Sequence, residues 1–96
     1  MMALLHGLRA LTTVSSAQSF GSRTLLEEVM EGKPLTPREL EILQLAAEGE
    51  SAHETAERID LAYETVKGYR KRIVAKLAAR NITHAAIIGV RTHLID

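Results

Sequence analysis

The most basic stretch of the chain is TVKGYRKR, at residues 65–72, in which four of the eight side chains are cationic. Lysine and arginine at this density are suited to binding phosphate groups, because they supply positive charge and several N–H donors. Gly68 interrupts the stretch, although glycine in a helix interior costs about 1 kcal/mol relative to alanine. The pattern indicates a helix that must come close to a large anionic surface.

Charge is distributed unevenly along the chain, although its 96 residues have a net charge of zero. Residues 35–64 contain two cations and eight acids, whereas residues 65–95 contain seven cations and no acid. A sign change over adjacent segments indicates a basic face that is turned outward. A solvated face without any partner would show the same run of charge, so the charge pattern alone leaves both interpretations open.

Composition excludes several other classes of protein. The absence of cysteine excludes disulfides and thiolate metal sites and favours a reducing cytosol. The four histidines lack metal-binding spacing, and nothing groups Ser, His and acidic residues into a triad, so we expect no metal, no cofactor and no catalytic residue. No window approaches the ~18 apolar residues of a membrane span, and the first fifteen residues fit an amphipathic helix better than a signal or transit peptide.

The apolar residues are aliphatic and helically spaced, which predicts an all-α fold. Residues 2–13 place leucines on one stripe, a Ser/Gly-rich connector follows at 15–22, and a second short helix is expected at about 23–31. We therefore divide the chain into a helical N-terminal extension, residues 1–34, and a four-helix domain, residues 35–96. The leucines of the stripe, which we expect to pack across a dimer or to cover the domain, are Leu4, Leu5, Leu8 and Leu11.

Helix boundaries in the second part are marked by local signals. Thr36 can cap a helix that has Pro37 at its first position and Glu39 three residues after the cap, which is a capping box. Gly49 fits the left-handed residue just beyond the end of that helix. A second capping box, SAHE at residues 51–54, opens the next helix, and the last helix is expected to start within residues 81–83.

Helices at 52–59 and 63–79 are separated by only a few residues and must cross steeply, which is typical of a DNA-binding helix-turn-helix. On the second of them, Val66, Ile73 and Leu77 share a face that would pack on the domain, with Tyr69 beside it. Such a helix fits the major groove, where a glycine would permit close approach; the alternative is a glycine that is merely tolerated at a solvent face. The opposite, outward face would carry Glu64, Lys67, Gly68, Lys71 and Ala75, with Arg72 at its edge.

Three segments, LTPRELEILQLAAEG, ESAHETAERIDLAYETVK and RIVAKLAARNITHA, resemble the LuxR-type (NarL/GerE-like) DNA-binding domain in order and spacing. The resemblance covers about residues 35–95. It implies a four-helix domain that binds double-stranded DNA, usually as a homodimer, with the third helix in the major groove and the fourth helping to dimerise. It also implies that Thr65 and Lys67 contact DNA and that Lys71 and Arg72 lie where further contacts are made.

The full set of DNA-contacting residues that we predict is Glu64, Thr65, Lys67, Gly68, Lys71, Arg72, Lys76, Arg80 and Asn81. Arg80 and Asn81 could touch phosphate or cap the last helix. The chain departs from the family pattern at three positions, where Ala62 replaces a capping Ser, Arg70 replaces an aliphatic residue and Thr55 replaces Ile.

These patterns predict a bacterial or phage transcription regulator that acts in the cytoplasm at the nucleoid, as a stand-alone binding domain without a sensor module. The alternative is a protein-interaction module, because the LTPRE opening and the basic helix also resemble region four of bacterial sigma factors. Its acidic surface at 39–64 would then bind RNA polymerase or another regulator, with little DNA binding.

Overall fold

The computed structural model describes residues 24–96, which form five helices and no strand within that range. The predicted all-α class is therefore confirmed. The leucine stripe at 2–13 and the connector at 15–22 lie outside the described residues. The helices are α2 (Leu25–Met30), α3 (Pro37–Ala47), α4 (Ala52–Arg58), α5 (Tyr63–Leu77) and α6 (Ile82–Arg91).

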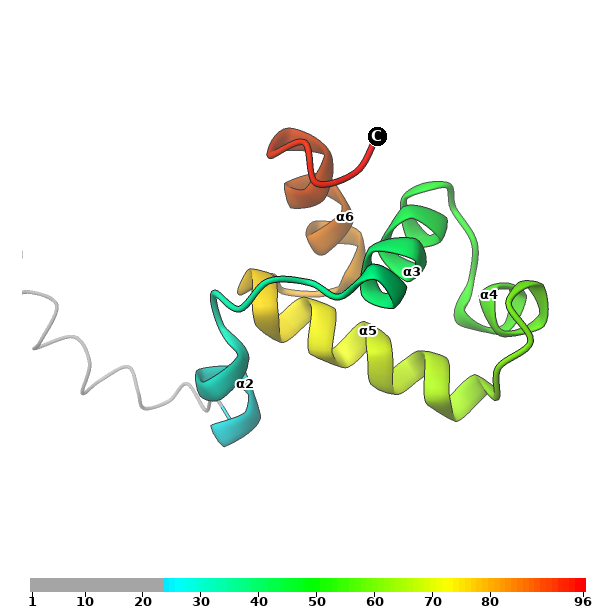
Figure 1. Ribbon diagram of the computed structural model, residues 1–96, viewed down its shortest axis with the longest axis horizontal. Coiled ribbons are helices and arrows are strands. Elements are labelled where there is room, and N and C mark those ends of the chain that lie inside the picture. Colours follow the sequence, from blue (N-terminus) through cyan, green and yellow to red (C-terminus); the bar gives the residue numbers. More distant parts are fainter. Residues whose placement is uncertain (1–23) are drawn as a thin grey trace, which may run out of the picture.

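Helix α5 is the central element, because it packs against each of the other four helices. In Figure 1 it runs along the lower side of the domain, with α3 and α6 above it, α4 beside one end and α2 beneath the other. Its upper face meets α3 and α6 in a small aliphatic core. The fully packed members of that core are Ile42, Leu43, Ile73, Ala85, Ala86 and Ile95.

The capping boxes form as predicted. The hydroxyl of Thr36 accepts a hydrogen bond from the N–H of Glu39, and the Glu39 carboxylate accepts one from the N–H of Thr36. Ser51 and Glu54 form the same pair of bonds at the start of α4. Gly49 has a φ of 95°, which is the left-handed conformation expected just beyond α3.

Helix α5 is two residues shorter than predicted. It was expected to reach position 79, but it ends at Leu77 because Ala78 has a φ of 54° and reverses the chain. The N–H of Ala79 then donates to the carbonyl of Val74, which satisfies an acceptor at the helix end. At the other end, Ala62 occupies the N-cap and makes no side-chain hydrogen bond, in agreement with the predicted loss of a capping hydroxyl.

Helix α2 lies against the C-terminal half of α5 but buries none of its own residues. The N–H of Gly32 donates to the carbonyl of Lys76, which ties the end of α2 to α5. Ala75 was expected on the outward face, and that expectation is wrong: only 4% of it is exposed, because α2 adds a second layer on this part of α5.

Within residues 24–96 no single helix is long and apolar enough to span a membrane; α5 and α6 pass such a test only as a pair bent by 53°.

Candidate nucleic-acid interface

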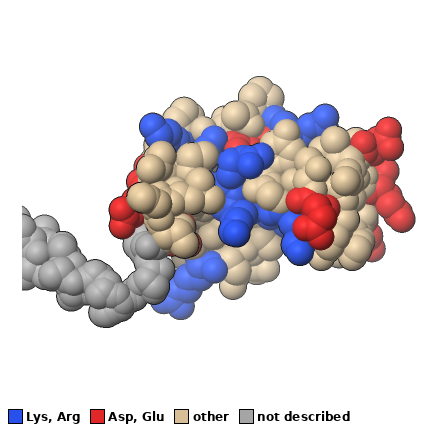
Figure 2. Space-filling model, turned by 90° about the horizontal axis from the view of Figure 1, so that it is seen from below, with Lys and Arg blue, Asp and Glu red and all other residues tan. Residues whose placement is uncertain are grey.

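A groove of about 720 Å³ runs along the exposed side of α5, bounded by α2, the start of α4 and the start of α6. Figure 2 views the molecule from this side and shows a band of Lys and Arg side chains across its middle, with acidic side chains toward both ends. The groove therefore lies on a positively charged face. Six of the nine predicted DNA-contacting residues line it: Glu64, Lys67, Gly68, Lys71, Arg80 and Asn81.

Gly68 lines this groove and is the sixth residue of α5, so it lies inside the helix and not at either end. A Cβ atom built at this position would meet no heavy atom within 4 Å apart from the helix's own backbone and its chain neighbours. Packing inside the domain therefore does not require glycine here. The missing side chain instead opens the helix surface toward whatever occupies the groove.

Lys67 and Lys71 flank Gly68 and are both exposed. Lys67 Nζ lies 5.0 Å from the centroid of the Tyr63 ring and 3.7 Å from Oε1 of Glu64, so its ammonium group is held near the start of α5. In the described part of the chain, Lys71 makes no ion pair or ring contact of this kind. The two lysines thus differ in how firmly they are placed, although they share one face.

Arg72 faces away from the groove, toward the body of the domain. Its guanidinium carbon lies 4.8 Å from the centroid of the Tyr69 ring, and its Nε lies 3.6 Å from Oε2 of Glu39. Its side chain is still 40% exposed. Arg72 can therefore reach a ligand only from the edge of the surface. The same holds for Thr65, which is exposed but does not line the groove.

Lys76 does not belong to the interface, and this part of the prediction is corrected. Its side chain is 8% exposed, and its Nζ donates to Oε1 of Glu39 at 2.7 Å and to the carbonyl of Pro34 at 3.0 Å. Because the Lys76 side chain is itself buried and its ammonium group is bonded to both partners, it is not available to a phosphate.

Asn81 caps α6, since its Oδ1 accepts a hydrogen bond from the N–H of His84 at 2.8 Å. The N–H of Arg80 donates to Nδ1 of His84, which fixes the backbone just before the cap. The side chain of Arg80 is exposed and lines the groove. Of the two roles that the sequence left open for Asn81, the structure thus shows capping, while Arg80 stays positioned for an anionic ligand.

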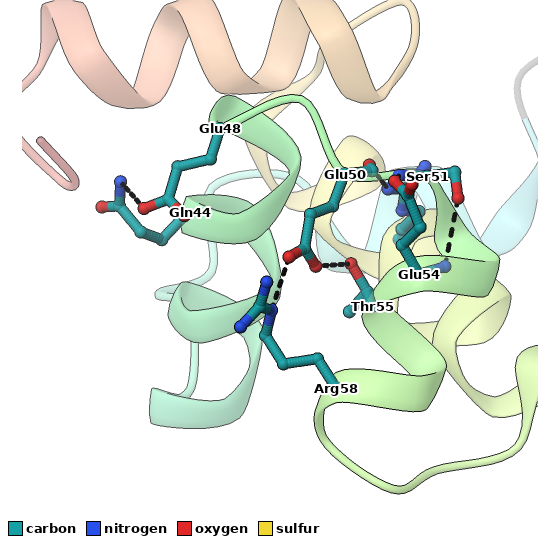
Figure 3. Close-up of polar contacts among 8 residues, drawn as sticks. Gln44, Glu48, Glu50, Ser51, Glu54, Thr55 and Arg58 are labelled. Carbon is teal, nitrogen blue, oxygen red and sulfur yellow. Dashed lines mark hydrogen bonds and ion pairs between the residues drawn. The ribbon is translucent and has the colours of Figure 1, made fainter.

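A polar cluster that the sequence analysis did not predict fixes the loop before α4 (Figure 3). The hydroxyl of Thr55, which is fully buried, donates to Oε1 of Glu50, and Arg58 Nε pairs with the other carboxylate oxygen. Arg70 Nη2 donates to the carbonyl of Glu50 at 2.8 Å, while burial lowers the pKa of Arg70. Two departures from the family pattern, Thr55 and Arg70, are therefore linked through Glu50, and this linkage helps to hold α4 against α5.

Residues 33–88 match the family described as bacterial regulatory proteins, luxR family. The chain belongs to this family. It is 39% identical over 70 residues to the transcriptional regulatory protein LiaR of Bacillus subtilis, covering 73% of this chain and 33% of LiaR. It is also 39% identical over 74 residues to the response regulator RamR of Streptomyces coelicolor, covering 75% of this chain and 37% of RamR.

A longer alignment, with the transcriptional regulatory protein YxjL of Bacillus subtilis, has 31% identity over 94 residues and covers 42% of that protein. The chain thus spans well under half the length of these curated relatives. The matched part is the DNA-binding domain of a LuxR-type transcription regulator, and α4 and α5 are the two helices of its helix-turn-helix.

Proposed function

We propose that this LuxR-type domain binds double-stranded DNA sequence-specifically, with α5 in the major groove, and thereby regulates transcription. The observation that carries the proposal is the gathering of Lys67, Lys71 and Arg80 along one groove beside Gly68. A major groove about 12 Å wide admits an α-helix, whose first turns then meet the base edges. Glu64 lies in the first turn of α5 and would face bases, with Thr65 reaching the DNA only from the edge of the surface, while Lys71 and Arg80 would face the DNA backbone.

A homodimer is the second part of the proposal, and α6 supports it. Ile87 and Val90 are each 44% exposed and form an apolar strip on the exposed side of α6, and Leu94, just beyond the end of the helix, is 42% exposed. A shallow hollow of about 370 Å³ beside this strip is lined mainly by small and aliphatic side chains of α3 and α6. A strip of this kind is suited to meeting its own copy, so that two α5 helices would be presented to two half-sites.

The acidic end of the domain favours a second candidate, an interaction with RNA polymerase or another regulator. A hollow of about 680 Å³ between the end of α3 and α4 is lined by four glutamates, with Arg58 among them. A basic protein surface would suit this hollow, whereas DNA would be repelled by it. On this second interpretation the basic face of α5 would contribute little.

The deciding experiment is a titration of the wild type against random-sequence duplex DNA and against a pool of selected sites, at two salt concentrations. We expect salt-dependent binding, with log K falling by about 0.9 per neutralised phosphate for each unit of log salt, and enrichment of an inverted repeat from the pool. The variant Lys67→Ala/Lys71→Ala should lose most of this binding.

The matched control is Glu54→Gln on α4, which changes charge outside the groove. It should leave binding to DNA nearly unchanged. No binding of the wild type at low salt would refute the DNA proposal and move the search to polymerase and other regulators.

A further inference from the structure

An aromatic stack joins the two helices of the helix-turn-helix at the point where α5 begins. The rings of His53, in α4, and Tyr63, the first residue of α5, lie with their centroids 3.7 Å apart and their planes 2° from parallel. Both residues are near the groove, which Tyr63 lines. The stack therefore fixes a ring at the edge of the surface that is proposed to meet DNA.

Tyr63 in turn contacts Lys67, one helical turn further along α5. A cation over the face of an aromatic ring is attracted by the ring's electron density, and the Lys67 ammonium is 5.0 Å from the Tyr63 centroid. Glu64 adds an opposite charge 3.7 Å from the same nitrogen. A lysine side chain is otherwise long and freely rotating, so these two contacts restrict where its charge can lie.

We propose that His53 is a positioning residue for sequence recognition: it holds the Tyr63 ring, and Tyr63 together with Glu64 holds Lys67 toward base edges. This inference rests on the proposed function. A lysine that is already paired with a carboxylate gains less from a phosphate than a free lysine does, because it must give up an existing partner. Lys67 therefore contributes mainly to discrimination between DNA sequences, and Lys71 contributes mainly to sequence-independent attraction.

The competing explanation is that the stack only fastens α4 to α5. In that case its loss would lower thermal stability and weaken binding to every DNA sequence alike. His53 is exposed at the surface of α4, so replacing it leaves the core intact. Its effect on recognition can therefore be measured in a folded protein.

The test compares Kd for the site selected by the wild type with Kd for random duplex DNA, in the wild type and in five variants, with a thermal melt of each protein. The variants are His53→Ala, His53→Phe, Lys67→Ala, Lys71→Ala and His53→Ala/Lys67→Ala. We expect His53→Ala to lower the ratio of affinity for the selected site to affinity for random DNA about tenfold, which is within the range that one base contact supplies. The affinity for random DNA and its dependence on salt should stay constant. His53→Phe keeps a ring for stacking and should restore the ratio.

Two further comparisons identify the path of the effect. His53→Ala/Lys67→Ala should discriminate no worse than Lys67→Ala alone, since His53 acts through Lys67. Lys71→Ala should instead reduce the salt slope and weaken both affinities similarly. In the free protein, NMR should show the side-chain methylene protons of Lys67 shifted upfield by the Tyr63 ring, and this shift should diminish in His53→Ala.

Two results would overturn this inference and leave the proposed function standing, provided that the wild type binds DNA. One is an equal loss of affinity for the selected site and for random DNA in His53→Ala. The other is additive effects of the His53 and Lys67 substitutions on the ratio of the two affinities. An unchanged NMR shift in His53→Ala would do the same. Failure of the wild type to bind any DNA would overturn the proposed function, and the inference with it.

Discussion

Lys76 Nζ lies 2.7 Å from a carboxylate oxygen of Glu39 inside the domain, and this ion pair joins α5 to the first turn of α3. The two side chains are only 8% and 3% exposed. Glu39 also closes the capping box with Thr36, and Arg72 lies 3.6 Å from its second oxygen. One carboxylate thus starts α3 and also holds the basic helix, so the orientation of the proposed DNA-binding face depends on a residue outside that face.

Replacing Lys76 by alanine should destabilise the domain strongly. Removal of one partner from a buried ion pair leaves the other charge uncompensated and costs about 3–5 kcal/mol. Urea denaturation followed by circular dichroism measures this directly. Lys71→Ala, which removes the same charge from an exposed position of the same helix, is the control and should change the free energy of unfolding by less than about 0.5 kcal/mol. Similar effects of the two substitutions would show that the buried pair is not important for stability.

Stability should fall in acid because of the same carboxylate. Burial raises the pKa of Glu39, but the hydrogen bonds from Lys76 and Thr36 and the charge of Lys76 outweigh it and lower the pKa below the ordinary value of 4.5. A carboxyl group with a lowered pKa in the folded state stabilises that state above its unfolded pKa, and the contribution is lost as the pH falls through the folded pKa. The free energy of unfolding should therefore decrease below pH 4.5.

The control for this pH effect is Glu39→Gln, which cannot titrate. It should be less stable than the wild type at neutral pH and should show a flatter dependence on pH in acid. If the variant and the wild type lose stability in parallel as the pH falls, other carboxyl groups are responsible for acid unfolding.

Local signals explain how much of this fold the sequence could predict. Thr36, Ser51 and Gly49 act on backbone groups within a few residues of themselves, so their roles were visible in the sequence and are confirmed. The burial of Lys76 could not be predicted from local signals of this kind. Its charge favoured solvent, and the carboxylate that keeps it inside lies 37 residues away along the chain.

The candidate site was predictable to a similar extent and for the same reason. Helical periodicity placed Lys67, Gly68 and Lys71 on one face, and the groove contains all three. The stack of His53 on Tyr63 depends on the angle at which two helices cross, and periodicity within one helix gives no information on that angle. The burial of Ala75 likewise results from α2, an element that contacts α5 only in the folded chain.

Ala62→Ser should stabilise the domain. Ala62 is the one N-cap among the five described helices that makes no side-chain hydrogen bond, although its φ and ψ of −69° and 148° are in the extended region that suits a cap. A serine hydroxyl could accept a hydrogen bond from an N–H in the first turn of α5, which stabilises a helix by about 1 kcal/mol. Thermal denaturation should show a higher Tm for Ala62→Ser. Ala62→Val, which adds a side chain without an acceptor, is the control and should not raise Tm.

Gly68→Ala should separate stability from function. Because the added Cβ would meet no heavy atom within 4 Å apart from the helix's own backbone and the chain neighbours, alanine should stabilise α5 by about 1 kcal/mol. The same methyl group would keep the helix from approaching DNA closely, so Kd for the selected site should rise. Equal or tighter DNA binding by Gly68→Ala would mean that this glycine is only tolerated at a solvent face.

Gly89→Ala is the contrasting variant on α6. A Cβ at Gly89 would lie 3.0 Å from Cδ2 of Leu43 and 3.1 Å from Cγ1 of Ile95, which is tighter than most packed contacts, so these core side chains would have to shift. Overpacking of this kind costs about 1–3 kcal/mol, so this variant should be less stable than the wild type. Chemical denaturation of the two alanine variants side by side should therefore give shifts of opposite sign.

Val90→Glu should dissociate the proposed dimer. Val90 lies with Ile87 in the exposed apolar strip on α6, and a carboxylate there would be buried against its own copy in a symmetric interface. Sedimentation equilibrium should show a monomer, and affinity should fall for an inverted repeat but not for a single half-site. Val29→Glu is the matched control, because it places the same charge on the exposed apolar side of α2. A monomer produced by Val29→Glu and not by Val90→Glu would place the interface on α2 and refute the α6 dimer.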